Sequence, residues 1–254
     1  MPAFDPRRLL GRRFRFDCAH PAVGLQEVPL HIPSGPLGEQ VVETWLLRID
    51  LSELDRAALA DLLSEPERQH LSACTHPAVA DRYLFSRATL RSLLGACLER
   101  DPAGLNIDVA AGGKPFLDEA CGGARLQFNL SHSGSWLLVA LAGGRAVGAD
   151  IEDDRPRPRM MQIAERFYHQ AERRMLLSVS EPERQALFLR CWTLKEAHAK
   201  ALGVGLRMDL SETDYSDLLN PSAPTRWRGR KGEWWVLPLP ALQGAIATVF
   251  AESL

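Results

Sequence analysis

The chain has 254 residues, of which 46% are hydrophobic and 24% charged, and its formal net charge is −2. That length suits one large domain or two closely packed halves, and either can bury a substantial core. The charge balance excludes the global basic field that attracts nucleic acid, so any anion-binding site has to be a local cluster.

The cysteines and the apolar runs indicate the compartment. The cysteines are odd in number and none forms a CxxC pair, which predicts neither a zinc site nor a disulfide framework and favours a reducing compartment. The longest apolar run, 136–142, is too short to span a bilayer, and the arginine-rich N-terminus lacks the apolar stretch of a secretory signal. We expect a cytoplasmic protein with no membrane segment.

The first part of the chain predicts a strand, helices and closing strands. Residues 1–40 show no clean periodicity, and 31–40 read as a loop. Serine and acidic residues at Ser52/Asp55 and Ser64/Glu67 indicate capping boxes that open helices. The pattern then predicts a strand at 41–51, a long helix at 78–98, a turn at 112–115 and strands at 125–131 and 135–141.

A second series follows the Gly143–Gly144 pair. It predicts a strand at 145–152, a helical stretch at 159–178, a capping box at Ser180/Glu183 with a helix to about 202, and strands within 225–239 and 244–253. Tryptophans flank the basic turn of the segment 225–239. A hairpin with its tryptophans packed inward is favoured there over stacking on single-stranded nucleic acid.

The two series suggest similar halves. The octamers SEPERQHL (64–71) and SEPERQAL (180–187) nearly match, although they do not keep the same register as the other repeated features. The octamer can therefore be a recurring helix start rather than a trace of duplication. We predict an N-terminal half at 41–144 and a C-terminal half at 145–254, with 1–40 as an extension packed with the first half.

Three acidic residues stand at spacings that suit chemistry. Asp150 and Glu152 are two apart in a predicted strand, so both side chains lie on one face. A hard cation such as Mg²⁺ would offset their repulsion, but for this pair taken alone a solvated strand end is the favoured interpretation. Glu196 and Lys200 are four apart on a predicted helix, which also fits an ordinary ion pair.

Taken together, the motifs resemble those of a known family. GxDxE at 148–152 followed by WxxKExxxK at 192–200 is similar to the signature pair of the Sfp-type 4′-phosphopantetheinyl transferases, and GGKPFL (112–117) and FNLSHSG (128–134) resemble two further family motifs in the expected order. The resemblance runs from Arg82 to Lys200. It implies an α+β fold built as a pseudo-dimer of two similar α/β halves, with the active site in the cleft between them.

The resemblance also implies an activity. A member of this family transfers the 4′-phosphopantetheine arm of coenzyme A to a serine of an apo acyl or peptidyl carrier protein, with Mg²⁺, and releases 3′,5′-ADP. It also implies a monomer. The charge balance and the short apolar runs predict neither nucleic acid nor a membrane as a partner. The alternatives are another Mg²⁺-dependent phosphotransferase or nucleotide hydrolase, and a non-catalytic module that binds coenzyme A.

Residue roles follow from the same resemblance. The metal ligands would be Asp150, Glu152 and Glu196. Catalysis would rest on Glu196, Lys200 and Asp150, with Glu196 or a metal-bound water as the base. Coenzyme A would be bound by Arg82, Lys114, Asn129, Ser131, His132 and Lys200. His132 would face the 3′-phosphate, and Arg87, Arg91 or Arg68 could replace Arg82 at the nucleotide.

Overall fold

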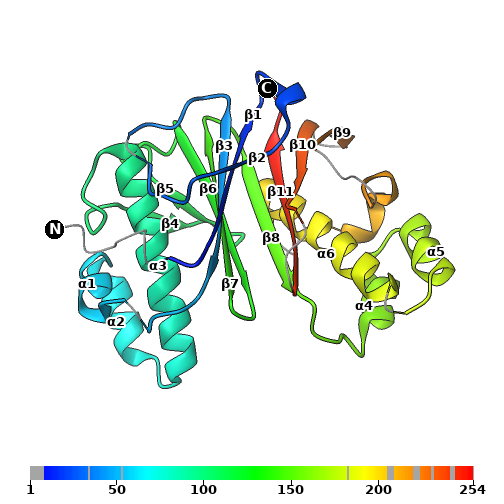
Figure 1. Cartoon of the computed structure of the whole chain (residues 1–254), viewed down its shortest axis with the longest axis horizontal. Helices are drawn as coiled ribbons and strands as arrows, with labels where there is room; N and C mark the ends of the chain where they lie inside the picture. Colours follow the sequence, from blue (N-terminus) through cyan, green and yellow to red (C-terminus); the bar gives the residue numbers. More distant parts are fainter. Residues whose placement is uncertain are drawn as a thin grey trace.

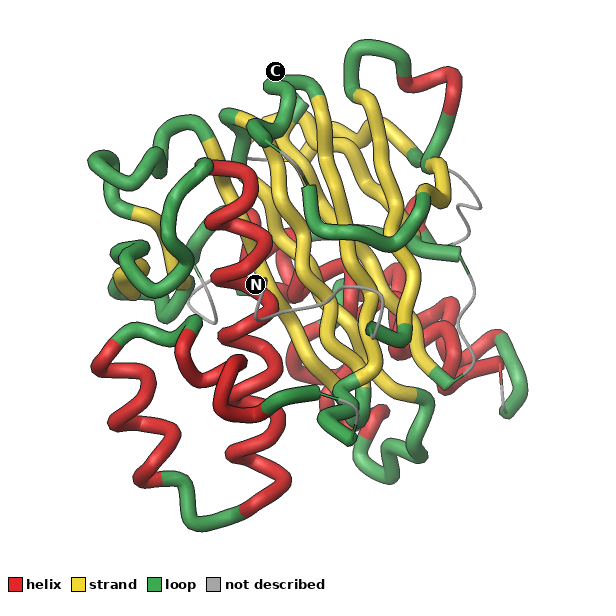
Figure 2. The backbone as a smooth tube through the Cα atoms, turned by 60° about the vertical axis from the view of Figure 1, so that its left-hand side comes forward, coloured by secondary structure: helices red, strands yellow, loops and turns green. Residues whose placement is uncertain are grey.

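The computed structural model describes residues 9–33, 35–52, 54–181, 183–204, 209–219, 224–229, 232–240 and 244–253. In this part of the chain two antiparallel sheets lie face to face, and helices cover the outer face of each sheet (Figure 1 and Figure 2). The predicted fold of mixed helices and sheets in two halves is confirmed.

The first sheet has five strands in the order β2-β1-β3-β7-β6, all paired antiparallel. A two-stranded hairpin, β4-β5, lies beside it. The strands are β1 (Gly11–Asp17), β2 (Gln26–Val28), β3 (Val41–Arg48), β4 (Ile107–Val109), β5 (Pro115–Leu117), β6 (Leu126–Ser133) and β7 (Trp136–Gly143).

The second sheet has four strands in the order β8-β11-β10-β9, again antiparallel. The predicted tryptophan-rich hairpin is confirmed as β9-β10, with Trp234 buried against the second half's core. The strands are β8 (Val147–Asp153), β9 (Thr225–Gly229), β10 (Gly232–Pro238) and β11 (Ala245–Glu252).

Three α-helices accompany each sheet within the described residues. The long helices α3 and α6 supply most of the buried helical surface, and the shorter ones pack beside them. The helices are α1 (Arg56–Asp61), α2 (Glu65–Ala73), α3 (Pro77–Leu98), α4 (Met160–Phe167), α5 (Gln170–Ser178) and α6 (Glu183–Ala201), with 3₁₀ turns at Pro21–Val23, Leu210–Glu212 and Ser216–Leu218.

The core has three parts because the central strands are apolar on both faces. In β7, Leu137 and Val139 pack toward α3, whereas Leu138 and Ala140 pack toward the second sheet. This alternation is the two-residue period of a strand. A third cluster fills the space between the second sheet and α6. Continuous burial on both faces explains the unbroken apolar run that the sequence shows at 136–142.

Helix starts follow local side-chain chemistry, with two corrections. The capping box of Ser64 and Glu67 is confirmed at the start of α2. The predicted box at Ser52 is wrong, because Asp55 itself caps α1 by accepting hydrogen bonds from two backbone amides. The Ser180 box adjoins residue 182, which lies outside the described residues.

The helix predicted at 159–178 is two helices. Tyr168 is extended, with φ −100° and ψ 143°, and it ends α4. His169 and Glu172 then form a capping box that starts α5. Histidine is an unusual cap, so the pattern of apolar residues concealed this break.

The N-terminal segment is more regular than its sequence suggested. β1 lies inside the first sheet between β2 and β3, and Phe14 and Phe16 are fully buried. Arg13 is also buried, because it forms an ion pair of 2.5 Å with Glu43 on β3. Residues 1–40 were expected to lack regular structure, and this expectation is wrong for residues 11–17, which form β1.

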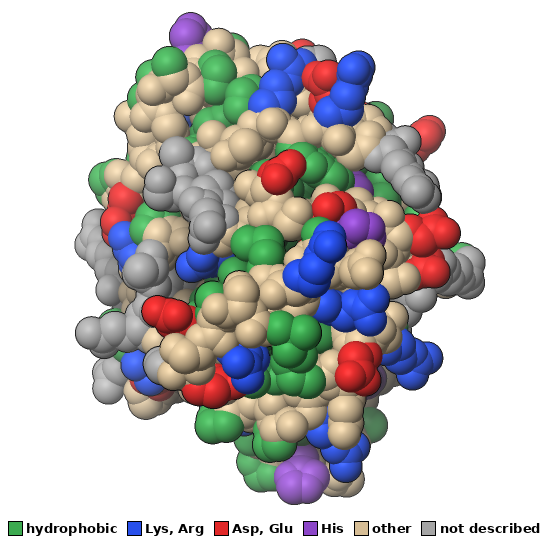
Figure 3. All heavy atoms as spheres, turned by 90° about the vertical axis from the view of Figure 1, so that its right-hand side faces the viewer, with side chains coloured by type: hydrophobic (Ala, Val, Ile, Leu, Met, Phe, Trp, Pro, Cys, Tyr) green, Lys and Arg blue, Asp and Glu red, His purple; other side chains and the backbone are tan. Residues whose placement is uncertain are grey.

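The two similar octamers occupy different elements. The first forms most of α2, a separate helix, whereas the second leads into α6, the long helix of the second half. They do not mark equivalent positions. Among the described residues no helix is both long and apolar enough to cross a membrane. The face that carries the helices of the second half shows basic and acidic side chains intermixed (Figure 3).

Candidate active site at the junction of the two halves

One face of β8 carries the predicted acidic residues. Ala149 and Ile151 point into the core between the sheets, so Asp150 and Glu152 point the other way, toward α6. Gly148 lies on that same face, and a Cβ there would come within 2.0 Å of the Ala197 carbonyl oxygen. The missing side chain thus lets α6 pack directly on β8 beside the acidic pair.

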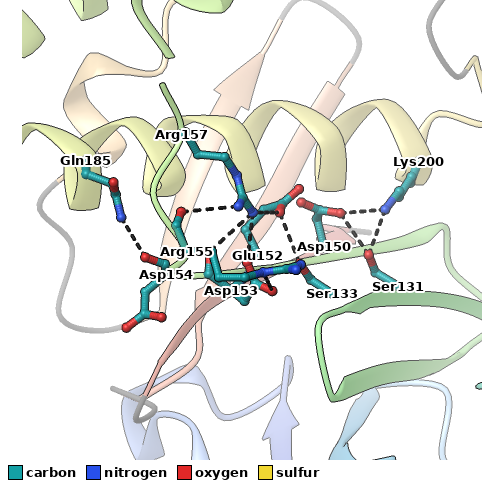
Figure 4. Close-up of polar contacts among 10 residues, drawn as sticks. All are labelled: Ser131, Ser133, Asp150, Glu152, Asp153, Asp154, Arg155, Arg157, Gln185 and Lys200. Atoms are coloured by element: carbon teal, nitrogen blue, oxygen red, sulfur yellow. Dashed lines mark hydrogen bonds and ion pairs between the residues drawn. The ribbon is translucent and has the colours of Figure 1, made fainter. Parts of the chain in front are cut away.

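A row of polar side chains on β6 meets this strand from the first half. Asn129, Ser131 and Ser133 alternate along β6 with side chains that face the first core. The Asn129 Oδ1 accepts a hydrogen bond of 2.8 Å from the Ala149 amide. The hydroxyls of Ser131 and Ser133 donate to Asp150 at 2.9 Å and to Glu152 at 3.2 Å (Figure 4). The two halves are therefore joined through the candidate site itself.

Asp150 is the most buried of the three acids, with 4% of its surface exposed. Its Oδ1 accepts from Ser131 and from the Lys200 ammonium at 2.6 Å, whereas its buried Oδ2 has no hydrogen-bond partner among the described residues. Burial raises the pKa of Asp150 to about 6, although Lys200 and Ser131 oppose the shift. An unpaired buried carboxylate oxygen is costly unless another ligand reaches it.

Glu196 lies near the same group of charges. Burial raises its pKa, the charge of Glu152 raises it further, and Lys200 opposes both. The spacing of Glu196 and Lys200 suggested an ion pair along the helix, but the ion pair that Lys200 makes is with Asp150. The raised pKa makes the Glu196 carboxylate a stronger proton acceptor than an ordinary glutamate.

The predicted metal ligands suit a hard cation by their chemistry. Carboxylate oxygens are the donors that Mg²⁺ prefers, and the unpartnered Oδ2 of Asp150 offers one. However, no three histidine, cysteine or acidic side chains of the described residues are already grouped around a metal position. Asp150, Glu152 and Glu196 could hold Mg²⁺ together with water and a substrate phosphate, so this assignment stays a prediction.

Two residues that sequence reasoning missed surround Glu152. Arg157 Nη2 donates to Glu152 Oε2 at 2.9 Å and to Asp153 Oδ1 at 3.0 Å, and the Ser133 hydroxyl bonds the same Glu152 oxygen (Figure 4). Ser133 lies within the motif FNLSHSG but has no role of its own among the expectations from the sequence, and Arg157 has none either. The only sequence feature that could have pointed to Arg157 is the run of arginines and prolines at 155–159, which follows the acidic residues of 150–154.

The predicted ligands of coenzyme A fall into two groups. Burial lowers the pKa of His132, and the nearby positive charges of Arg82 and Lys200 lower it further. Lys114 lies apart from them, and its ammonium donates to the Val147 carbonyl oxygen at 2.8 Å. Burial lowers the pKa of Lys114 to about 8. Asn129, as described above, bonds the backbone of β8.

The other arginines proposed for the nucleotide have partners elsewhere. Arg91 is buried and binds Glu67 and the carbonyl oxygens of Pro102 and Leu105. Arg87 lies 3.7 Å from Glu67, and Arg68 pairs with Glu65 on its own helix. Arg82 makes no ion pair within the described part of the chain, which leaves it available for an anionic ligand.

Known proteins similar to this chain share one description. Residues 146–237 match the family model of the 4′-phosphopantetheinyl transferase superfamily, and residues 52–144 match that of the 4′-phosphopantetheinyl transferase N-terminal region. The 4′-phosphopantetheinyl transferase HetI of Nostoc sp. is 32% identical over 217 residues, which cover 85% of this chain and 90% of HetI. The 4′-phosphopantetheinyl transferase Sfp of Bacillus subtilis is 28% identical over 160 residues, which cover 63% of this chain and 69% of Sfp.

Proposed function

Because the chain belongs to the 4′-phosphopantetheinyl transferase superfamily, we propose that it takes the phosphopantetheine arm from coenzyme A, with Mg²⁺, and places it on a carrier-protein serine. The chain is an enzyme of the phosphopantetheinyl transferase class, and its relatives support transfer to carrier proteins. The use of coenzyme A and of Mg²⁺ is the finer part of the proposal.

One observation carries the proposal. Ser131 from the first half, Asp150 from β8 and Lys200 from α6 form one hydrogen-bonded group at the junction of the halves. Each belongs to a different motif of the family resemblance. Along the chain, Asp150 is 19 residues from Ser131 and 50 residues from Lys200. Chance sequence matches would have no reason to converge on one carboxylate.

The residues of this site support distinct roles in binding. Lys200 has 27% of its side chain exposed and can bind a phosphate oxygen as a point charge. The Arg82 guanidinium and the nearby His132, which a bound phosphate would bring into its charged form, are suited to the 3′-phosphate. When bound at Asp150, Glu152 and Glu196, Mg²⁺ would neutralise the diphosphate of coenzyme A and help 3′,5′-ADP to leave.

Glu196 is the proposed base. The serine oxygen of the carrier protein forms a bond to the β-phosphorus of coenzyme A, the bond from that phosphorus to the oxygen of 3′,5′-ADP breaks, and the serine proton passes to the carboxylate. The raised pKa of Glu196 favours its acceptance of that proton. Both halves of the site come from one chain, which supports activity as a monomer.

The test is a mass-shift assay. The protein is incubated with Mg²⁺, coenzyme A and a panel of apo acyl and peptidyl carrier domains, and intact-protein mass spectrometry follows each carrier. A gain of one phosphopantetheine, absent when the acceptor serine is replaced by alanine or when EDTA is added, is expected. Cleavage of coenzyme A without carrier modification would favour a hydrolase, and tight binding without turnover would favour a non-catalytic module.

A further inference from the structure

Two hydrogen-bonded clamps of the same design lie side by side on β8. In the first, the Ser131 hydroxyl and the Lys200 ammonium both bond Oδ1 of Asp150, at 2.9 and 2.6 Å. In the second, the Ser133 hydroxyl and the Arg157 guanidinium both bond Oε2 of Glu152, at 3.2 and 2.9 Å. Each clamp combines a serine of β6 with a cation of the second half (Figure 4).

Each clamp saturates one carboxylate oxygen and leaves the other open. Among the described residues, neither Oδ2 of Asp150 nor Oε1 of Glu152 accepts a hydrogen bond. The serines are two residues apart on β6, as are the acids on β8, so the period of the two strands repeats the arrangement. The geometry thus keeps two open oxygens on one face of one strand.

Arg157 is itself held in place. Besides Glu152, its Nη2 contacts Asp153 Oδ1 at 3.0 Å and the Asp153 carbonyl oxygen at 3.3 Å, and its Nη1 contacts the Arg155 carbonyl oxygen at 3.2 Å. Three quarters of its side chain is covered. A surface arginine would lose conformational entropy on binding Glu152, whereas Arg157 is already fixed by its other bonds.

We propose that Ser133 and Arg157 are positioning residues, which hold Glu152 by Oε2 so that Oε1 faces a divalent cation. The inference rests on the proposed function, since that cation is the proposed Mg²⁺. Hydrogen bonds that orient a ligating carboxylate raise metal affinity, and their loss typically lowers it about 10- to 100-fold.

Whether cation affinity rises or falls on removal of Arg157 distinguishes a role in orienting Glu152 from a simple effect of charge. Removing a positive charge beside a cation site should strengthen cation binding if only charge mattered. The charge of Arg157 is already offset by Asp153, with which it forms an ion pair. Loss of Arg157 therefore frees Glu152 to turn away from the site and leaves little net gain in attraction, so affinity falls.

Arg155 provides a matched control. It is two residues away, its side chain is 69% exposed, and its ion pair is with Asp153 and not with Glu152. Arg155→Gln and Arg157→Gln make the same change in charge next to the same acidic group. Only the second removes a hydrogen bond from a proposed metal ligand.

The experiment measures Mn²⁺ binding to the whole protein by the electron paramagnetic resonance signal of free Mn²⁺, with and without coenzyme A. Arg157→Gln should weaken Mn²⁺ binding by about 10- to 100-fold, whereas Arg155→Gln should change it by less than about fivefold. Arg157→Lys, which keeps the charge, should recover part of the affinity. Ser133→Ala should weaken binding in the same direction without any change in charge, and it decides the matter if Arg157→Gln does not fold.

Unchanged or tighter Mn²⁺ binding by Arg157→Gln, or equal losses of Mn²⁺ affinity in both arginine variants, would overturn the proposed positioning role. These outcomes are distinct from failure of the proposed function. If the wild-type protein modifies carriers and binds Mn²⁺, and the Ser133→Ala and Arg157→Gln variants bind Mn²⁺ equally well, only the positioning role is refuted. A wild-type protein that neither binds Mn²⁺ nor modifies any carrier refutes both.

Discussion

Lys200 Nζ lies 2.6 Å from Asp150 Oδ1, and this ion pair fastens α6 to β8 at the junction of the two halves. The lysine thus pairs with a carboxylate of the candidate site. A phosphate oxygen that approaches the site would compete with Asp150 for the same ammonium, while a metal ion would compete with Lys200 for the same carboxylate. Ligand binding is therefore expected to rearrange this pair.

The first prediction concerns the stability cost of Asp150. Its pKa is raised to about 6, whereas an unfolded aspartate titrates near about 3.9. Between these values the folded protein holds a proton that the unfolded chain has released, so stability falls as the pH rises from about 4 to about 6. Two pKa units correspond to about 3 kcal/mol.

Asp150→Asn removes this charge and should therefore stabilise the metal-free protein at pH 8 by about 1–3 kcal/mol, with no gain below about pH 4. Urea unfolding in EDTA across this pH range measures the difference. Asp108→Asn, a change at an exposed position of β4, is the control and should leave the free energy of unfolding at pH 8 within about 0.5 kcal/mol of the wild type. A stability gain that did not depend on pH would refute the assigned pKa.

Glu196 gives the second prediction. Glu196→Gln keeps the size of the side chain but cannot accept a proton, so carrier modification should fall by at least about 10²-fold. Circular dichroism and thermal unfolding should stay close to those of the wild type. Glu165→Gln, at an exposed position of α4, should retain full activity. Near-normal turnover of Glu196→Gln would remove Glu196 from both proposed roles, as base and as metal ligand.

The sequence predicted the parts of the site that depend on local periodicity. A strand alternates its faces, so Asp150 and Glu152 had to share one, and the apolar Ala149 and Ile151 had to share the other. The partner of Lys200 could not be predicted in this way. Helical spacing predicted Glu196 as the ion-pair partner of Lys200. The close packing of α6 on Gly148 brings Lys200 to Asp150 instead.

Long-range pairing explains the remaining differences between expectation and structure. Arg91 lies on the same helix as Arg82, yet Arg91 is buried because it binds Glu67 on α2. Arg13 alternates with the apolar Phe14 and Phe16 along β1, a position typical of a solvated residue, yet it is buried against Glu43, which is 30 residues away. The contact between Arg157 and Glu152 depends on how the chain turns after β8, which no periodic pattern encodes.

His132 gives the third prediction. Packing around the ring and the charges of Arg82 and Lys200 lower its pKa, so the free protein holds it neutral near pH 7. A bound 3′-phosphate would favour the charged form. His132→Ala should therefore weaken coenzyme A binding about tenfold or more, and 3′-dephospho-coenzyme A much less. Calorimetry with both ligands measures this, with the 74% exposed His20 changed to Ala as control. Equal losses for the two ligands would contradict the placement.

Lys114 gives the last prediction, which distinguishes a lysine that binds a phosphate from one that only stabilises the fold through its hydrogen bond to Val147. Its pKa is lowered to about 8 by burial, and its ammonium bonds only the Val147 carbonyl oxygen among the described residues. Above pH 8 most of the free protein therefore carries a neutral Lys114. A phosphate beside it would favour the charged form and raise the pKa again.

Binding of coenzyme A near pH 9 should then take up a proton, and Lys114→Met should abolish that uptake. Calorimetry in two buffers of different ionisation enthalpy measures the number of protons, and the comparison with the variant cancels the ionisation of the ligand's own thiol. His132 titrates at lower pH and adds nothing there. If uptake is the same in both proteins, Lys114 holds the hairpin β4-β5 to the start of β8 and does not bind phosphate.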